Sequence, residues 1–246
     1  MNAPATLHAL REAEPGYVLH SYPFKETSLV VEVFTRDLGR IGLVAKGARR
    51  PRSALRGTLL AFQPLLLSWS GKSELRVLRR AEWAAGHPQL AGLALVCGFY
   101  LNELVLKLTR RDDPHEGTYA AYEDALSALR AGDAPAAALR RFERRMLADL
   151  GYGLTLGHDA HGADVDAAAS YTYVPERGAV PFDAAAGARY AEVPVAGKTL
   201  LDMARDDYSD PVTMQQSRAV MRLVINHHLG GQLLHTRQLL RDMHFS

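Results

Sequence analysis

The chain reads YVLHSYPFKETSLVVEVFTRDLGRIGLVAKG over residues 17–47, and this stretch carries its strongest structural signal. Leu29, Val31 and Val33 alternate with the side chains of the opposite face, a period of two that is typical of a β-strand. An Asp-Leu-Gly turn at 37–39 separates this run from the next one. The stretch therefore predicts consecutive strands joined by tight turns.

Five runs of this kind lie in the N-terminal third of the chain. They cover residues 17–22, 28–34, 40–45, 59–69 and 74–83. Five short strands predict a small barrel, and the five-stranded Greek-key barrel of this size is the OB-fold. The strand count alone leaves other small barrels open.

Beyond residue 88 the apolar residues change to a spacing of three and four, which is typical of helices. The first helical run has its apolar positions at Leu93, Val96, Cys97, Tyr100, Leu101, Leu104 and Leu108. Further helices are predicted at residues 117–132, 135–151, 211–229 and 238–243. Asp210 is the expected N-cap of the 211–229 helix, with Pro211 in its first turn.

Residues 152–195 interrupt the helical pattern. They are rich in Ala, Gly and Asp, with one strand-like run at 170–174. We therefore expect an α+β protein, in which an OB-fold barrel in residues 1–84 packs on a mainly helical domain in residues 85–246. An irregular, β-containing insertion is expected at about residues 155–195 of that helical domain.

The amino-acid composition indicates a globular protein. The chain has 246 residues, 48% of them hydrophobic, so it can bury a sizeable core. It has no run of about 18 apolar residues, and its first residues lack the basic start and apolar stretch of a signal peptide. Cys97, the single cysteine, excludes an internal disulfide and a multi-thiolate zinc site. These features predict a cytoplasmic protein without a membrane partner.

The formal net charge of +2 conceals a difference between the two parts of the chain. Residues 1–80 contain 13 Lys and Arg against 6 Asp and Glu, a net charge of +7. Residues 81–246 contain 16 against 21, a net charge of −5. Such a split predicts a module that binds a polyanion, attached to a body with a different task.

The stretch VAKGARRPRSALRG, residues 44–57, concentrates this positive charge. It contains no acidic residue and five cationic ones, Lys46, Arg49, Arg50, Arg52 and Arg56. Like charges repel each other unless a polyanion neutralises them, although a solvated surface loop has the same composition. On a barrel connection, the cations can approach a sugar-phosphate backbone. Tyr22, Phe24 and Phe34 are candidates for base stacking, and each also suits the core.

Signatures of catalysis are sparse. The chain has no GxxxxGK[ST], no GxGxxG after a strand, no GxSxG and no HExxH. Cys97 lies on the apolar face of a predicted helix, where a thiol is typically a small buried hydrophobe. HDAHGADVD at 158–166 places two imidazoles near carboxylates, but it lacks a second ligand pair, which favours a solvated loop. We therefore predict a protein that is not an enzyme and has no metal or cofactor.

The chain also resembles a known family. The run YVLHSYPFKETSLVVEVFTRDLGRIGLVAKGARRPRS looks like the N-terminal OB-fold of RecO, a family of bacterial recombination mediators and DNA repair proteins. The likeness continues in FYLNELVLKL, LRRFERRMLADLGYGL, the YTYV run with its following Arg-Gly, and HHLGGQLLHTRQLLRDM. The resemblance covers essentially the whole chain.

The resemblance implies a non-enzymatic DNA repair and recombination protein of the nucleoid that binds single- and double-stranded DNA and anneals complementary strands. It also implies that RecR helps the protein to load RecA onto strands coated by single-stranded-DNA-binding protein. Carried over, Lys46, Arg49, Arg50, Arg52 and Arg56 become the DNA-binding residues. Arg140, Arg141, Tyr100 and Leu104 become candidates for binding the acidic, Phe-terminated tail of the coating protein.

The chain departs from the family at one place. Many members hold a four-cysteine zinc site after the LGY segment, where this chain has His158 and His161 and no cysteine. Two histidines do not replace four thiolates, so the resemblance implies a zinc-free variant. Two alternatives stay open: an OB-type RNA-binding module, because charge alone does not separate RNA from DNA, and a metal-dependent hydrolase that uses residues 158–166.

Overall fold

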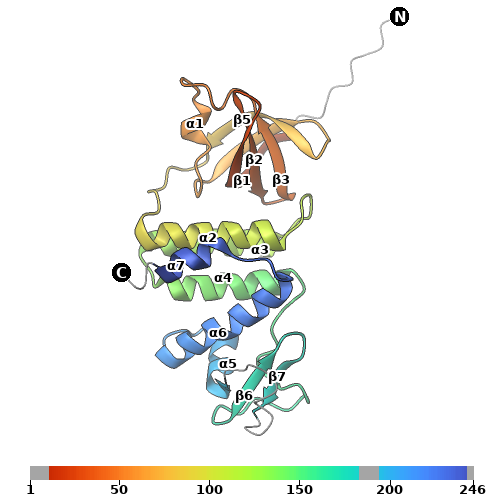
Figure 1. The fold of residues 1–246 in the computed structure, drawn as a ribbon, viewed down its shortest axis with the longest axis vertical. Helices are drawn as coiled ribbons and strands as arrows, with labels where there is room; N and C mark the ends of the chain where they lie inside the picture. The colour runs from red at the N-terminus through yellow and green to blue at the C-terminus, as the bar shows by residue number, and fades with distance from the viewer. Residues whose placement is uncertain (1–10, 183–193, 243–246) are drawn as a thin grey trace, which may run out of the picture. The chain divides into compact units, whose positions relative to one another are not determined.

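The computed structural model describes residues 11–182 and 194–242 of the chain. It divides into two compact units (Figure 1). The first unit comprises the chain up to Leu126 together with the segment from Leu234 onward, and the second comprises Ser127–Leu233. Among the described residues, none of the helices is long and apolar enough to cross a membrane.

The first unit contains a barrel and the helices next to it. Its strands are β1 (Arg11–Phe24), β2 (Ser28–Thr35), β3 (Gly39–Ala45), β4 (Leu65–Ser70) and β5 (Leu75–Trp83). Its helices are α1 (Leu55–Thr58), α2 (Gly92–Leu108), α7 (His235–Asp242) and most of α3 (Glu116–Ala131), which continues into the second unit.

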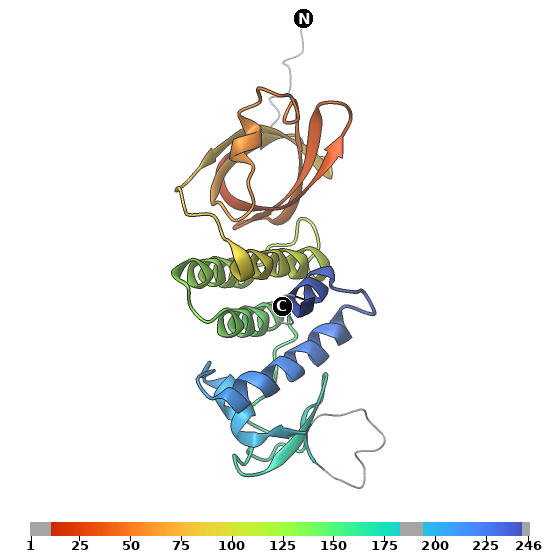
Figure 2. The same cartoon turned by 60° about the vertical axis from the view of Figure 1, so that its left-hand side comes forward.

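The five strands close into a barrel in the order β1-β2-β3-β5-β4 (Figure 2). β3 and β5 pair in parallel, and the other neighbours pair antiparallel. The predicted OB-like barrel is therefore confirmed. Its interior is filled by alternate residues of the strands, including Val31, Val33, Leu43, Leu67 and Trp69. Burying a side chain of this size stabilises the fold by about 1.5–3 kcal/mol.

The fourth strand is shorter than predicted, because residues 59–64 are not part of it. α1 precedes this segment, and the backbone N–H of Leu59 donates to the carbonyl of Leu55 in a last helical turn. The N–H of Leu60 donates to Thr58, and Pro64 has no N–H at all. These three residues therefore cannot donate hydrogen bonds to a neighbouring strand, and β4 begins at Leu65.

The helix α2 packs on the barrel through its buried face. Asn102 Nδ2 donates to the carbonyl of Leu19 on β1 at 2.8 Å, and the Tyr122 hydroxyl donates to Asn102 Oδ1 at 2.6 Å. The predicted core positions Cys97 and Leu101 are indeed buried. The polar groups that α2 carries into this contact are therefore hydrogen-bonded, which avoids the cost of burying them unpaired.

The last helix, α7, begins at His235, earlier than the predicted 238, and residue 243 lies outside the described residues. The Glu103 carboxylate on α2 accepts hydrogen bonds from the backbone N–H groups of His235 and Thr236, at 2.8 and 2.9 Å. It also accepts one from the Thr236 hydroxyl at 2.6 Å. A carboxylate from a distant part of the chain thus caps α7, and local sequence patterns contain no sign of it.

The second unit combines helices with a small sheet. Its elements are α4 (Pro135–Asp149), β6 (Ser170–Val174), β7 (Gly178–Pro181), β8 (Val195–Ala196), α5 (Gly197–Ala204) and α6 (Pro211–His228). The sheet order is β7-β6-β8, all antiparallel. Asp210 caps α6 as predicted, since its carboxylate accepts from the N–H of Thr213 at 2.8 Å. Part of the predicted insertion, residues 183–193, lies outside the described residues.

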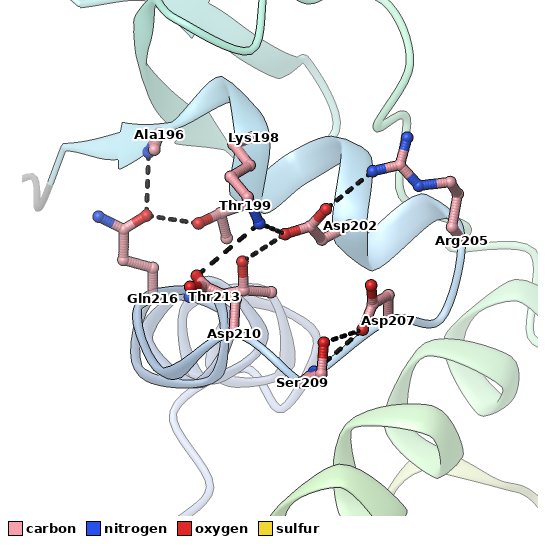
Figure 3. Close-up of polar contacts among 10 residues, drawn as sticks. All are labelled: Ala196, Lys198, Thr199, Asp202, Arg205, Asp207, Ser209, Asp210, Thr213 and Gln216. Atoms are coloured by element: carbon pink, nitrogen blue, oxygen red, sulfur yellow. Dashed lines mark hydrogen bonds and ion pairs between the residues drawn. The ribbon is translucent and has the colours of Figure 1, made fainter.

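The eight-residue helix α5 was not predicted, and it is held to α6 by a buried carboxylate (Figure 3). The Asp202 side chain, 3% exposed, accepts from Thr213 Oγ1 at 2.7 Å and from Arg205 Nη2 at 2.8 Å, and pairs with Lys198. Burial alone would raise the pKa of Asp202, but the hydrogen bonds from Lys198, Thr213 and Arg205 lower it below its ordinary value. Asp202 is therefore a structural ion that joins two helices.

Candidate nucleic-acid interface

The basic loop, residues 46–54, leaves the barrel at the end of β3 and leads into α1. Gly47 adopts a positive φ of 70°, and the N–H of Arg50 donates to the carbonyl of Gly47 at 3.1 Å, which forms a tight turn. Ala48 is fully buried in the barrel core. The loop backbone is therefore anchored at Ala48, and its long side chains extend outward.

The structure exposes every one of the five predicted DNA-binding side chains, Lys46, Arg49, Arg50, Arg52 and Arg56. Four of them, all except Arg49, make no side-chain hydrogen bond or ion pair within residues 11–182 and 194–242. An exposed cation without a protein partner is available to a phosphate at little desolvation cost. Their assignment to DNA remains a prediction.

Arg49 differs from the other four because its side chain donates hydrogen bonds to backbone carbonyls of the barrel. Its backbone N–H donates to the carbonyl of Thr27 at 2.9 Å, and its Nη1 donates to the carbonyls of Lys25 and Glu26 at 3.3 Å each. These three bonds attach the basic loop to the turn between β1 and β2. Arg49 is thus a positioning residue that sets the place of the other cations.

The same attachment brings in a cation that sequence analysis missed. Lys25 lies in the β1–β2 turn, and its ammonium is 5.4 Å from the centroid of the Phe24 ring. The hydrogen bond from Arg49 places this turn beside the basic loop, 24 positions away in the sequence. An isolated lysine in a turn has no distinguishing pattern, so only the tertiary contact reveals it as a neighbour.

The three aromatic candidates for stacking have different environments. Phe34 is completely buried, with its ring centroid 5.4 Å from Tyr119 and 6.1 Å from Tyr122 on α3. Phe24 is half-buried, whereas Tyr22 is 46% exposed. Phe34 therefore belongs to the core between barrel and helices, and Tyr22 presents the most accessible ring of the three.

A buried carboxylate lies on the outer face of the same barrel. The Glu32 side chain on β2, 2% exposed, pairs with Arg111 and, at 3.4 Å, with Arg40 Nη1. Hydrogen bonding to Glu32 raises the pKa of Arg111 above its ordinary value. Two cations thus neutralise the Glu32 carboxylate, so it does not repel an anion from this face.

The four tail-binding candidates divide between the two units. Tyr100 and Leu104 lie in the first unit and are buried, and Arg237 Nη2 on α7 donates to the Tyr100 hydroxyl at 3.4 Å. Arg140 and Arg141 lie on α4 in the second unit. A tail that contacts Tyr100 or Leu104 would have to reach side chains that are covered in this structure.

The two candidate arginines, Arg140 and Arg141, also differ from each other. Arg140 is buried and pairs with the buried carboxylate of Glu143 at 2.6 Å. Arg141 is exposed, with its guanidinium 5.8 Å from the centroid of the Tyr208 ring and a bond to the carbonyl of Asp206 at 3.4 Å. Arg141 is therefore the accessible member of the pair, and Arg140 has a structural partner.

The HDAHGADVD segment forms a turn that is bonded internally. The Asp159 carboxylate accepts from the N–H groups of His161 and Ala163, at 2.8 and 2.9 Å, and these bonds lower its pKa. His158 Nδ1 is 2.9 Å from Asp164 Oδ1. Within the described ranges, no three His, Cys, Asp or Glu side chains come together as a metal site would require. The segment contacts β7 through the N–H of Ala160.

Comparison with known proteins adds a separate observation. Residues 10–87 match the family model for the N-terminal part of recombination protein O, and residues 89–237 match the model for its C-terminal part. The chain is 54% identical to the DNA repair protein RecO of Nitrosospira multiformis over 233 residues, 94% of this chain and 96% of that protein. It is 52% identical to the RecO of an Azoarcus species over the same shares. The chain therefore belongs to the RecO family of DNA repair and recombination proteins.

Proposed function

We propose that this protein is a cytoplasmic, nucleoid-associated recombination mediator that binds DNA through its basic loop. The observation that carries the proposal is a group of four exposed cations that make no side-chain hydrogen bond or ion pair among the described residues. Lys46, Arg50 and Arg52 lie on the basic loop, which Arg49 attaches to the β1–β2 turn, and Arg56 lies in the helix α1 that follows it. The family supports the same conclusion, because its members are named DNA repair proteins. Phosphate contacts of this kind carry no sequence information, so single and double strands of any sequence are ligands.

Annealing of complementary strands follows from the same contacts. Two DNA strands repel each other through their phosphates, and cations that neutralise phosphates release condensed counterions. A protein that holds one strand on such a surface lowers the repulsion that a second strand meets. This activity requires no bond chemistry, which agrees with the proposal that the protein is not an enzyme and has no cofactor.

Recruitment to coated DNA is the proposed task of the helical part. An acidic peptide that ends in Phe needs a cation next to an apolar surface. Arg141 and Arg140 with Tyr100 and Leu104 are the residues that the family resemblance assigns to this peptide, and Arg141 is exposed. RecR and RecA are the proposed downstream partners, in that RecR cooperates with this protein to load RecA.

Salt dependence of DNA binding tests the loop directly. If Lys46, Arg50, Arg52 and Arg56 all contact phosphates, log K should fall against log salt with slopes of about −2.8 on single strands and −3.6 on duplex. The double variant Arg50→Glu, Arg52→Glu should bind every sequence more weakly and with a flatter slope.

A matched control exists on the exposed side of α6. Arg218 and Arg222 are exposed and make no side-chain hydrogen bond or ion pair among the described residues. The variant Arg218→Glu, Arg222→Glu therefore changes the net charge equally without altering the loop. An equal loss of affinity in both variants would refute the loop as the binding site. Preference for matched RNA over DNA in competition would favour the RNA-binding alternative.

A further inference from the structure

A row of apolar side chains crosses the outer face of the barrel. The strand register pairs Tyr22 with Val30, Val30 with Val44, and Val44 with Val77, so the row spans β1, β2, β3 and β5. Neighbours in sequence such as Val31, Leu43 and Leu78 point into the barrel core. Because side chains alternate along a strand, the paired residues point outward. We call Tyr22, Val30, Val44 and Val77 the apolar row.

The apolar row is accessible, whereas the positions on one side of it are covered. The ring of Tyr22 is 46% exposed, and the three valines are half-buried. The adjacent row contains Glu32, Gly42 and Leu75. A Cβ placed on Gly42 would lie 2.7 Å from Leu75 Cδ2 and 3.4 Å from the Arg111 guanidinium carbon, so these side chains lie over Gly42. The apolar row is therefore accessible, and it lies next to the part of the outer face that other side chains cover.

The ring of Tyr22 has a defined neighbour. His20 lies two residues before Tyr22 on β1, and the two ring centroids are 4.5 Å apart with planes inclined at 63°. An edge-to-face contact of this kind restrains the tyrosine ring, which remains exposed to solvent. The ring is thus held on the barrel surface.

Cations lie around the apolar row. Lys46 follows Val44 by two residues, and Arg79 follows Val77 by two residues; both are exposed. β3 and β5 run parallel at this point, so these two cations lie on the same side of the row, where Arg79 Nε also donates to Ser70 Oγ at 2.7 Å. Lys25 lies beyond Tyr22, in the turn that Arg49 holds. Glu32, the acid of the adjacent row, pairs with two arginines, Arg40 and Arg111.

We propose that the apolar row is the surface on which the bases of single-stranded DNA lie, with a base stacked on Tyr22 and the phosphates directed toward Lys46 and Arg79. The inference rests on the proposed DNA-binding function and adds its source of strand selectivity. Cations bind the phosphates of single and double strands alike, but only a single strand presents the faces of its bases. An apolar row with cations along its edge complements a strand that is apolar on one side and anionic on the other.

Binding to an abasic strand separates the row from the loop. The probes are a labelled single strand, an abasic strand of the same length and charge, and a duplex, each titrated against the full chain. The unaltered protein should bind the normal strand more tightly than the abasic one. Tyr22→Ala should weaken binding of the normal strand at least about 5-fold and leave the abasic strand and the duplex unchanged. Tyr22→Phe keeps the ring and should retain the affinity.

Tyr152→Ala is the matched control, because Tyr152 is 48% exposed and lies in the other unit, stacked on His228. It should leave all three affinities unchanged. Photocrosslinking of a strand that carries 5-iododeoxyuridine should label the peptide that contains Tyr22.

The outcomes distinguish this inference from the proposed function. Equal affinity of the unaltered protein for normal and abasic strands, or an equal loss on all probes in Tyr22→Ala, would overturn the role of the apolar row while DNA binding stands. Absence of binding to any probe would instead refute the proposed function.

Discussion

The Arg49 guanidinium donates a hydrogen bond to the backbone carbonyl of Lys25, 24 positions earlier in the chain. Through this bond the most basic loop of the protein is joined to the turn between the first two strands. Arg49, one of the five predicted phosphate ligands, therefore also holds the loop in place within the protein. Removing the Arg49 side chain should therefore make the loop more mobile, an effect separate from the loss of one positive charge.

Arg49→Ala should increase the rate of amide hydrogen exchange in residues 46–54, because the loop loses the two side-chain bonds to the β1–β2 turn and keeps only the backbone bond to Thr27. Arg50→Ala removes the same charge without removing a hydrogen bond and should leave the exchange rates unchanged. Exchange measured by mass spectrometry on both variants tests this difference. Equal rates in the two variants would contradict a positioning role for Arg49.

Asp202→Asn should lower the free energy of unfolding by about 1–3 kcal/mol, because the buried carboxylate that accepts from Lys198, from Arg205 and, on α6, from Thr213 becomes a neutral amide. Part of the full cost is offset, because Lys198 and Arg205 are more than half exposed and water solvates them. Urea unfolding measures the change. Asp207→Asn is the control, since Asp207 is exposed and its carboxylate accepts hydrogen bonds from the N–H and the hydroxyl of Ser209 (Figure 3).

The same carboxylate should make stability depend on pH. Folding lowers the pKa of Asp202, so its contribution is fully present above the unfolded-state pKa and is lost as the pH falls through the folded-state pKa. The unfolding free energy should therefore decrease in the range below about pH 4. In Asp202→Asn this part of the slope should disappear, and an unaltered slope would show that other carboxylates cause it.

Glu103→Gln should loosen α7, because a neutral amide accepts hydrogen bonds from the helix N-terminus more weakly than a carboxylate does. Burial would raise the pKa of Glu103, but bonds from Thr236, His235 and Lys107 lower it, which shows that folding favours the charged form. Faster hydrogen exchange in residues 235–239 is the expected result. Glu123→Gln, a half-buried glutamate on α3, serves as the comparison variant.

Arg141→Ala should weaken binding of an acidic, Phe-terminated peptide and leave the unfolding free energy nearly unchanged, because Arg141 is exposed. Arg140→Ala removes a charged partner of the buried Glu143 carboxylate and should also destabilise the fold. Calorimetric titration with the peptide and thermal unfolding separate the two effects. Peptide affinity that is unchanged in Arg141→Ala would remove this residue from the proposed recruitment site.

Much of the fold was predictable because its signals are local. Alternation of side chains identified the strands of the barrel, and the spacing of apolar residues identified α2, α3, α4 and α6. The N-cap Asp210 was recognised for the same reason, since its partner Thr213 is three residues away. The basic stretch at residues 44–57 was also evident, because its five cations stand close together without an acid.

The elements that were missed depend on distant partners. The helix α5 is held to α6 by the hydrogen bond that Thr213 Oγ1 donates to Asp202, and α7 starts where Glu103 of α2 caps it. Neither partner adjoins its helix in sequence, so local patterns contain no trace of them. Residues 59–64 were assigned to a strand on their apolar character, although the backbone groups of Leu59 and Leu60 are used in turns.

For the proposed interface, the residue types and the charge of the loop follow from the amino-acid order alone. The tertiary structure decided which of these groups are available. It covered Phe34 with α3 and left Tyr22 exposed, paired Arg49 with the β1–β2 turn, and aligned Tyr22 with valines from three other strands. The reason is physical: composition and periodicity are properties of neighbouring residues, whereas exposure and pairing depend on segments that meet only when the barrel closes.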